Sequence, residues 1–159
     1  MALGANLGDR RGNILRGMKR LEELSAERLL RSALWETAPV DCPPGSPPFV
    51  NAVVGLRPRA EEKPETLLRK LKALEREFGR QPKTVLNEPR PLDLDLIAFG
   101  RETRATPDLT LPHPRAHVRR FVLQPLSEIA PELVLPGQTQ TVAQLLDQLP
   151  PGASMRKLT

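Results

Sequence analysis

The stretch PRPLDLDLIAFG, residues 89–100, contains an unusual pair of charges within an apolar run. Residues 92–99 are predicted to form a strand, in which successive side chains point to opposite faces. Three leucines then share the face toward a core, and two aspartates share the other face: Leu92, Leu94 and Leu96 against Asp93 and Asp95. The two like charges lie close together, where they repel each other unless water or a cation separates them.

An isolated pair of aspartates on a strand has two explanations. The common one is a polar face in contact with water. The other is a site for a hard cation such as Mg²⁺, which often takes one or two carboxylates together with substrate phosphates and water. Arg90 lies just upstream, so a cation, a phosphate and an arginine can meet there. This stretch alone leaves both explanations open.

The segments on either side of this strand predict the rest of the fold. Strand and helix patterns follow in the order β-α-β-β-α-β, with helices after them. This order favours an α+β fold, a ferredoxin-like α/β sandwich with an antiparallel sheet, and one domain over residues 1–159. The predicted segments are a strand ending near Gly4, a helix capped by Asp9, strands at 29–35 and 49–56, a helix from Pro64 to Phe78, the strand at 92–99, a short extended piece at 109–112, and helices near 117–128 and 141–149.

Composition narrows the class of protein. The chain has 159 residues and no apolar run long enough to span a membrane. It has no signal-peptide pattern and a single cysteine, Cys42, so we expect a cytoplasmic protein. A net charge of +5 suits anionic partners, but aromatic residues make up only 3%, which disfavours single-stranded nucleic acid. We therefore expect no nucleic-acid or membrane partner, and a monomer.

Two further motifs carry candidate site residues. LGANLGDR, residues 3–10, is a glycine-containing turn without the Gly-Lys-Ser/Thr of a P-loop. LPHPRAHVRRFVLQPL, residues 111–126, holds His113 between two prolines, followed by Arg119 and Arg120. A lone histidine is usually structural, but a rigid one near two arginines favours phosphate binding.

Together these motifs resemble the 6-hydroxymethyl-7,8-dihydropterin pyrophosphokinases of folate biosynthesis. The resemblance rests on LGANLGDR, ETAPV…PPFVNAVV, ALEREFGR, PRPLDLDLIAFG and LTLPHPRAHVRRFVLQPLSEIAPE, in the family's order and over almost the whole chain. It implies transfer of the β,γ-diphosphoryl group of ATP to the pterin hydroxymethyl oxygen, with release of AMP. It also implies two Mg²⁺ ions. An RNA-binding module and a catalytically dead relative are the rival interpretations, and the aspartate pair disfavours both.

The resemblance also implies roles for individual residues. It places Asp93 and Asp95 as the Mg²⁺ ligands, and these two with Arg80 and Arg90 as the catalytic set. The ATP contacts would be Glu75, Leu96, Leu109, Thr110, His113 and Arg119, and the pterin contacts Thr37, Val40, Phe49, Asn51 and Phe121.

The loop at 80–90 departs from the family pattern. Pro82 and Leu86 stand where arginines are usual, Asn87 replaces a tryptophan, and Glu88 replaces a glycine. We therefore expect this loop to close over ATP with a different set of contacts. In these, Lys83 partly substitutes for the missing arginines as a point charge.

Overall fold

The computed structural model describes residues 1–38, 44–79, 90–152 and 154–158. Its elements follow the predicted β-α-β-β-α-β order, and three short strands, a 3₁₀ turn and two helices come after that series in the described residues. In chain order they are β1 (Ala2–Ala5), α1 (Arg10–Glu22), β2 (Leu30–Arg31), β3 (Leu34–Thr37), β4 (Phe49–Gly55), α2 (Pro64–Glu77), β5 (Asp93–Asp95), β6 (Arg104–Ala105), β7 (Thr110–Leu111), the 3₁₀ turn η1 (Ala116–Val118), α3 (Arg120–Ile129), α4 (Val142–Gln148) and β8 (Met155–Leu158).

The main sheet has the strand order β5-β1-β4-β3-β8, and all neighbouring strands in it are antiparallel. The strands β1 and β3, between which α1 and the short strand β2 occur in the chain, are separated by β4. Likewise β4 and β5, which α2 connects, are separated by β1. This interleaving is that of a ferredoxin-like sheet, so the predicted α+β sandwich is confirmed.

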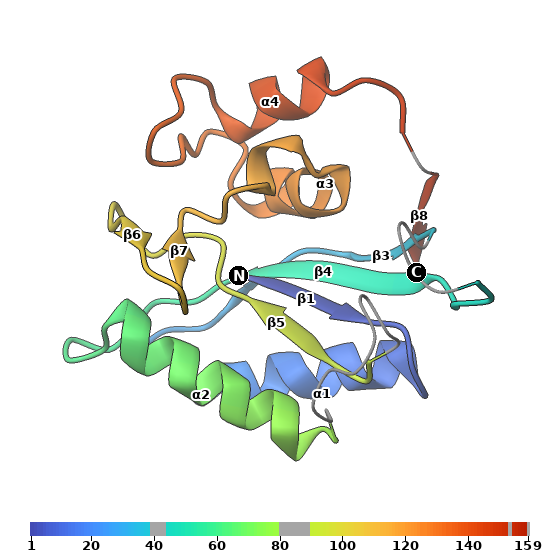
Figure 1. The fold of residues 1–159 in the computed structure, drawn as a ribbon, viewed down its shortest axis with the longest axis horizontal. Helices are drawn as coiled ribbons and strands as arrows, with labels where there is room; N and C mark the ends of the chain where they lie inside the picture. Colours follow the sequence, from blue (N-terminus) through green and yellow to red (C-terminus); the bar gives the residue numbers. More distant parts are fainter. Residues whose placement is uncertain (39–43, 80–89, 153, 159) are drawn as a thin grey trace.

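Helices cover both faces of this sheet (Figure 1). The helices α1 and α2 lie below it in the view, and α3 and α4 form a second layer above it. The short pair β6–β7 forms a separate two-stranded sheet beside these layers. In the described part of the chain, no helix has the length and apolar character needed to cross a membrane.

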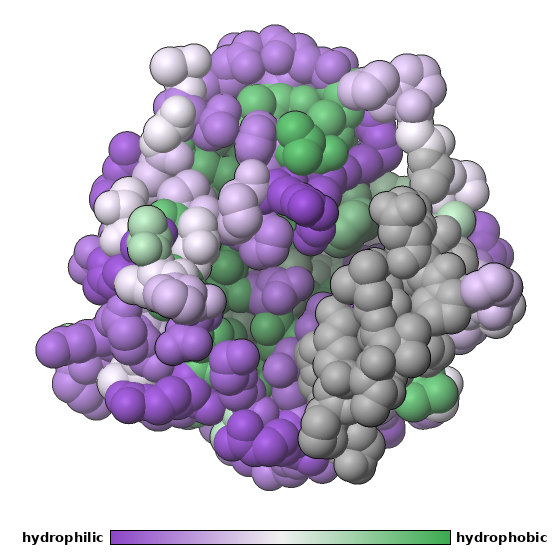
Figure 2. Space-filling model, in the orientation of Figure 1, coloured by the Kyte–Doolittle hydropathy of each residue, from purple (hydrophilic) through white to green (hydrophobic). Residues whose placement is uncertain are grey.

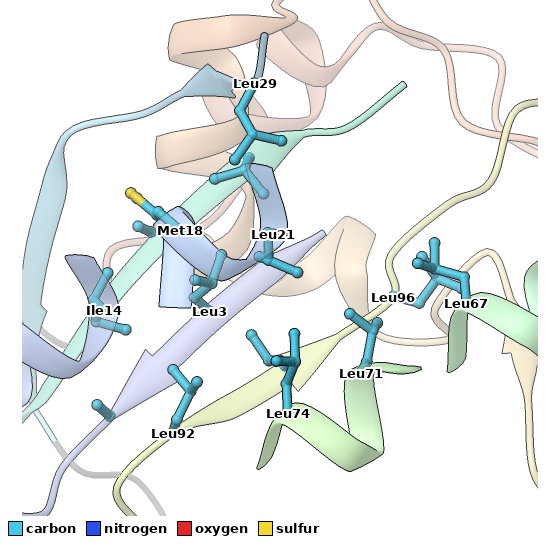
Figure 3. Packing of buried hydrophobic residues seen from close by; sticks show 14 of the residues in the cluster. Leu3, Ile14, Met18, Leu21, Leu29, Leu67, Leu71, Leu74, Leu92 and Leu96 are labelled. Atoms are coloured by element: carbon cyan, nitrogen blue, oxygen red, sulfur yellow. The ribbon is translucent and has the colours of Figure 1, made fainter. Parts of the chain in front are cut away.

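The larger core lies between the sheet and the lower helices (Figure 3). Burying a leucine-sized side chain stabilises the fold by about 1.5–3 kcal/mol, so this layer contributes much of the stability. Its largest fully buried side chains come from β1, α1, β4, α2 and the start of the β5 segment: Leu3, Ile14, Met18, Leu21, Val50, Val54, Leu67, Leu71 and Leu92.

The structure differs from the predicted elements at three places. The segment 29–35 divides into β2 and β3 because Ser32 interrupts it, with its Oγ accepting from the backbone N–H of Val53 (2.9 Å). The strand predicted at 92–99 is paired only over Asp93–Asp95. The strand β8, which extends the sheet beside β3, was not predicted, because its four residues show no alternation.

Candidate active site

The strand β5 separates its leucines from its aspartates as predicted. Leu92, Leu94 and Leu96 are buried, whereas Asp93 and Asp95 are only partly buried. The strand lies at one edge of the main sheet. The two carboxylates therefore share a face at an accessible edge of the fold.

Glu75 on α2 holds the middle of this strand. Its side chain is buried, and Glu75 Oε2 accepts a hydrogen bond from the backbone N–H of Leu94 (2.8 Å). Leu94 lies between the two aspartates, so this bond fixes the backbone that carries both. The ATP contact predicted for Glu75 from sequence similarity stays a prediction, and the bond to Leu94 gives this residue a supporting role as well.

The face that carries the aspartates is only partly covered by α3 and α4. Ala2 lies opposite Asp95 on β5 and Val53 on β4, and this row packs against the upper helices. Two residues further along β1, Gly4 lies opposite both Asp93 and Asn51. In the space-filling view, apolar residues are visible in a hollow between the α3–α4 layer and α2 (Figure 2).

Gly4 keeps the space between Asp93 and Asn51 open. A Cβ atom at Gly4 would lie 3.1 Å from Asn51 Oδ1 and 3.7 Å from Phe49 Cδ1. The first distance is tighter than an ordinary contact, so a side chain here would press on Asn51. Gly4 therefore forms the floor between the acidic strand β5 and the polar residues of β4.

Arginine and histidine side chains approach the aspartates from two directions. Arg90 Nη1 lies 3.3 Å from Asp93 Oδ2, and both side chains are largely shielded from water. His113 follows β7, and Arg119 is the N-cap residue of α3. Arg90 is thus paired with Asp93, and the electrostatic effect of Asp93 on both His113 and Arg119 indicates that these two groups lie in its vicinity.

Burial and neighbouring cations lower the pKa of His113. Burial has the largest effect, Arg119 and Arg115 add to it, and Asp93 opposes it. The backbone N–H of Arg115 donates to His113 Nδ1 (3.2 Å). Nδ1 is thus an acceptor, so the neutral ring carries its proton on Nε2. Burial also lowers the pKa of Arg119, with Asp95 and Asp93 opposing and Arg115 adding to the shift.

The predicted pterin residues lie on two strands and one helix. Asn51 on β4 and Thr37 on β3 are both buried, and Asn51 Nδ2 donates to Thr37 Oγ1 (2.7 Å). This bond orients Asn51, and in the described part of the chain its Oδ1 makes no hydrogen bond. Phe49 lies beside Gly4. Phe121 at the start of α3 is 36% exposed, with the Arg119 guanidinium 5.4 Å from its ring centroid.

The remaining predicted residues are less closely grouped. Leu96 and Leu109 are buried in the larger core, and Leu109 bonds to Thr106 through both its backbone N–H and its carbonyl. Thr110 lies on β7 in the separate two-stranded sheet. Val40, Arg80 and Lys83 lie outside the described residues, as do the substituted positions 82 and 86–88.

The donor set at β5 suits a hard cation bound together with phosphate. Across the described ranges, no three His, Cys, Asp or Glu residues form a metal-binding group. Two carboxylates are the number that Mg²⁺ often takes when phosphates and water complete its octahedron. Asp93 and Asp95 are opposite Gly4 and Ala2, whose small size leaves room beside the carboxylates.

Three residues at this site were not identified from the sequence. Gly4 and Asn6 belong to LGANLGDR, which on its own is a weak signal, and Arg115 follows His113 directly after Pro114. A glycine within a strand pattern often marks a place where a ligand or another backbone approaches closely. Gly4 was therefore the easiest of the three residues to predict from the sequence. Asn6 depends on a contact with Arg90, far along the chain, which no local pattern reveals. Arg115 lies only two residues from His113, but its bond to that ring depends on how the chain turns between them.

Comparisons with known proteins agree with this geometry. Residues 1–131 match the model of the family described as 7,8-dihydro-6-hydroxymethylpterin-pyrophosphokinase. A 2-amino-4-hydroxy-6-hydroxymethyldihydropteridine pyrophosphokinase of Porphyromonas gingivalis is 39% identical over 137 residues, which cover 84% of this chain and 90% of the relative. A Synechocystis protein of the same name is 36% identical over 149 residues, covering 94% and 74%.

A larger relative shows the same unit within a longer chain. The folate synthesis bifunctional protein of Arabidopsis thaliana is 36% identical over 129 residues, which cover 81% of this chain but only 26% of the relative. Both the family match and the relatives confirm the resemblance that the sequence motifs indicated. The chain belongs to the 7,8-dihydro-6-hydroxymethylpterin-pyrophosphokinase family and is thus a pyrophosphokinase, a transferase of folate biosynthesis that uses ATP as co-substrate.

Proposed function

We propose that the chain transfers the β,γ-diphosphoryl group of ATP to the hydroxymethyl group of 6-hydroxymethyl-7,8-dihydropterin at the face shared by β5, β1 and β4. The observation that carries this proposal is the row Asp93–Gly4–Asn51 across three adjacent strands. It has carboxylates at one end for a cation and phosphates, and an amide at the other end for a pterin edge. The glycine between them leaves space where the two substrates can meet.

Asp93 and Asp95 would hold the Mg²⁺ ions, of which the family resemblance implies two. When bound, these ions supply neutralisation of phosphate charge and fix the orientation of the triphosphate. The support here is the shared face of the two carboxylates and the small residues opposite them.

Arg90, Arg119 and His113 would bind the phosphate oxygens directly. The two guanidinium groups can each offer two parallel N–H donors to a phosphate. The lowered pKa of His113 keeps its ring neutral near pH 7, and its Nε2–H remains available as a donor. Glu75 would fix the strand that carries the aspartates. Holding reactants in line in this way accounts for much of the rate in phosphoryl transfer.

Asn51 would read the polar edge of the pterin. Its Nδ2 is held by Thr37 Oγ1, so its Oδ1 is fixed as an acceptor above Gly4. Phe49 and Phe121 would stack on the two faces of the flat ring, and Phe121 is sufficiently exposed to do so.

Other predictions from the sequence stay proposals. Arg80 would contribute to catalysis, Lys83 would contact the triphosphate, and Val40 would line the pterin loop. Leu96, Leu109 and Thr110 would line the adenosine site. We also propose that residues 1–159 act as one domain, in a cytoplasmic monomer without nucleic-acid or membrane partners.

The reaction can be tested by measuring AMP release from ATP by the purified chain. We expect AMP only when 6-hydroxymethyl-7,8-dihydropterin and Mg²⁺ are both present, with pterin diphosphate formed in equal amount. Release of ADP, or AMP formation independent of the pterin, would contradict the proposed transfer. A matched reaction with pterin lacking the hydroxymethyl group serves as the control.

A further inference from the structure

The backbone of Arg90 is held from the end of β1 by one buried residue, Asn6. The backbone N–H of Asn6 donates to the carbonyl of Arg90 (3.1 Å). In return the backbone N–H of Arg90 donates to Asn6 Oδ1 (2.7 Å). Asn6 is 0% exposed, so the partner that holds Arg90 is itself fixed within the fold. Two bonds to a single residue fix its backbone in position and in orientation.

Pro91 explains why a side chain takes part in this contact. Gly4 lies opposite Asp93 in the β1–β5 ladder, so extending that register by two residues places Asn6 opposite Pro91. A proline has no backbone N–H and cannot continue the ladder. Asn6 instead bonds one residue further along, at Arg90. Pro91 also restricts the residue before it to extended conformations, which strengthens the restraint on Arg90.

A second asparagine holds the other side of the same dipeptide. Asn13 on α1 donates from Nδ2 to the carbonyls of Pro91 (3.1 Å) and Leu7 (3.3 Å). The Arg90–Pro91 backbone is therefore attached both to the end of β1 and to the first helix. The side chain of Arg90 reaches from this anchored backbone to Asp93.

The orientation of Asn6 leaves one of its own groups unsatisfied. Its Nδ2 is buried and has no hydrogen-bond partner among the residues that the structure describes. Turning the amide over would place this donor against the N–H of Arg90, so the observed orientation is required by the bond to Arg90. A buried donor without a partner is destabilising, and such a group in a folded protein often marks a functional constraint. Stability alone would not favour an asparagine here.

We propose that Asn6 is a positioning residue of the reaction, which holds Arg90 in place beside Asp93 for contact with the phosphates. This inference rests on the proposed role of Arg90 in transfer. A guanidinium displaced by about 1 Å can cost about a hundredfold in rate, so loss of the anchor should act on kcat. Asn6 itself need not touch either substrate.

The test is a double-mutant cycle with Asn6→Ala, Arg90→Ala and the combined variant. We measure kcat and KM for AMP release, and urea unfolding for each protein. Asn6→Ala should lower kcat by about ten- to a hundredfold, with the KM values close to those of the wild type. In the Arg90→Ala background the same substitution should lower kcat little further, because it acts through a residue already removed.

Ser25→Ala is the matched control for lost stability. Ser25 is also buried, and its Oγ accepts from a backbone N–H, that of Arg57 (3.1 Å), at the far end of β4. This variant should unfold more readily yet keep its kcat. If Asn6→Ala is too unstable to assay, Asn13→Ala removes the second anchor of the same dipeptide. It should also lower kcat in the wild type, and should lower it little further in the Arg90→Ala background.

The outcomes separate this inference from the proposed function. If Arg90→Ala is slow but Asn6→Ala and Asn13→Ala turn over at the wild-type rate, the positioning role is wrong and the proposed function stands. The inference would also be overturned if the loss of kcat in the double variant equalled the product of the two single losses, since the two residues would then act independently. If Arg90→Ala itself retains wild-type kcat, the role of Arg90 in transfer fails, and the inference fails with it.

Discussion

Substituting Gly4 by alanine should weaken pterin binding while leaving ATP binding and stability almost unchanged. The added methyl would lie 3.1 Å from Asn51 Oδ1 and 3.7 Å from Phe49 Cδ1, and no other non-neighbouring atom of the described residues lies within 4 Å. Both of these residues are proposed pterin contacts, and neither is a proposed ATP contact. The perturbation is therefore confined to one half of the site.

The expected size follows from the space around Asn51. Without ligand, Asn51 can move by the few tenths of an ångström that the methyl requires, and alanine in a strand gains about 0.5–1 kcal/mol over glycine. With a pterin bound, the ring blocks this movement. Overpacking of a filled site typically costs about 1–3 kcal/mol, which corresponds to a loss of affinity of about fivefold to 150-fold.

Calorimetric titration of Gly4→Ala with the pterin, and separately with a non-hydrolysable ATP analogue, measures both affinities. Gly152→Ala is the matched control, because among the described, non-neighbouring residues a Cβ atom there meets only the carbonyl oxygen of Pro150, at 4.0 Å. Wild-type pterin affinity in Gly4→Ala would show that the pterin does not lie between Asp93 and Asn51. Equal losses for both ligands would show a general distortion of the sheet, and would equally refute the reasoning.

Four further predictions concern the charged and aromatic residues of the site. Asp93→Asn or Asp95→Asn should reduce kcat by orders of magnitude at saturating Mg²⁺, with urea unfolding close to that of the wild type. Phe121→Ala should weaken pterin binding by about tenfold, the value of a lost aromatic contact of about 1.4 kcal/mol, and calorimetry should show little effect on ATP. Burial lowers the pKa of His113 most and Arg115 lowers it further, so Arg115→Ala should raise the pKa that an NMR titration of the ring reports. In the wild type, the lowered pKa means that the folded protein binds fewer protons at His113 than the unfolded chain does. The free energy of unfolding should therefore fall as pH decreases through 6.5 toward the lowered pKa. His113→Gln should remove this dependence in urea unfolding measured from pH 5 to 8.

Local patterns were sufficient to predict most of the secondary structure. The alternation of leucine and aspartate placed Asp93 and Asp95 on one face. The Asp9 cap was also predicted, and its Oδ1 accepts from the backbone N–H of Gly12 (3.0 Å). The ends of strands were predicted less well, because they depend on partners. After Asp95 the chain leaves the ladder, and the carbonyl of Ile97 accepts instead from the N–H of His113.

The composition of the site was predictable only in part, for the same reason. Side-chain chemistry and family resemblance led to the carboxylates, the cations and Asn51 as predicted site residues. Neither could show that Gly4 separates Asp93 from Asn51, since that depends on the register of three strands. Nor could they show that Glu75 and Asn6 bond to backbone groups of the β5 segment, because these pairs lie far apart in the sequence.

The place of β5 at the edge of the sheet has a consequence for self-association. An exposed edge strand offers unpaired backbone groups to another chain, and charged residues are a common protection against such pairing. If β5 of two molecules paired in antiparallel fashion about Leu94, each Asp93 would face the Asp95 of the other molecule. The resulting repulsion among four carboxylates disfavours that contact. The aspartates proposed for catalysis would thus also help to keep the protein in solution, and an Asp93→Asn/Asp95→Asn double variant should aggregate at lower protein concentration than the wild type.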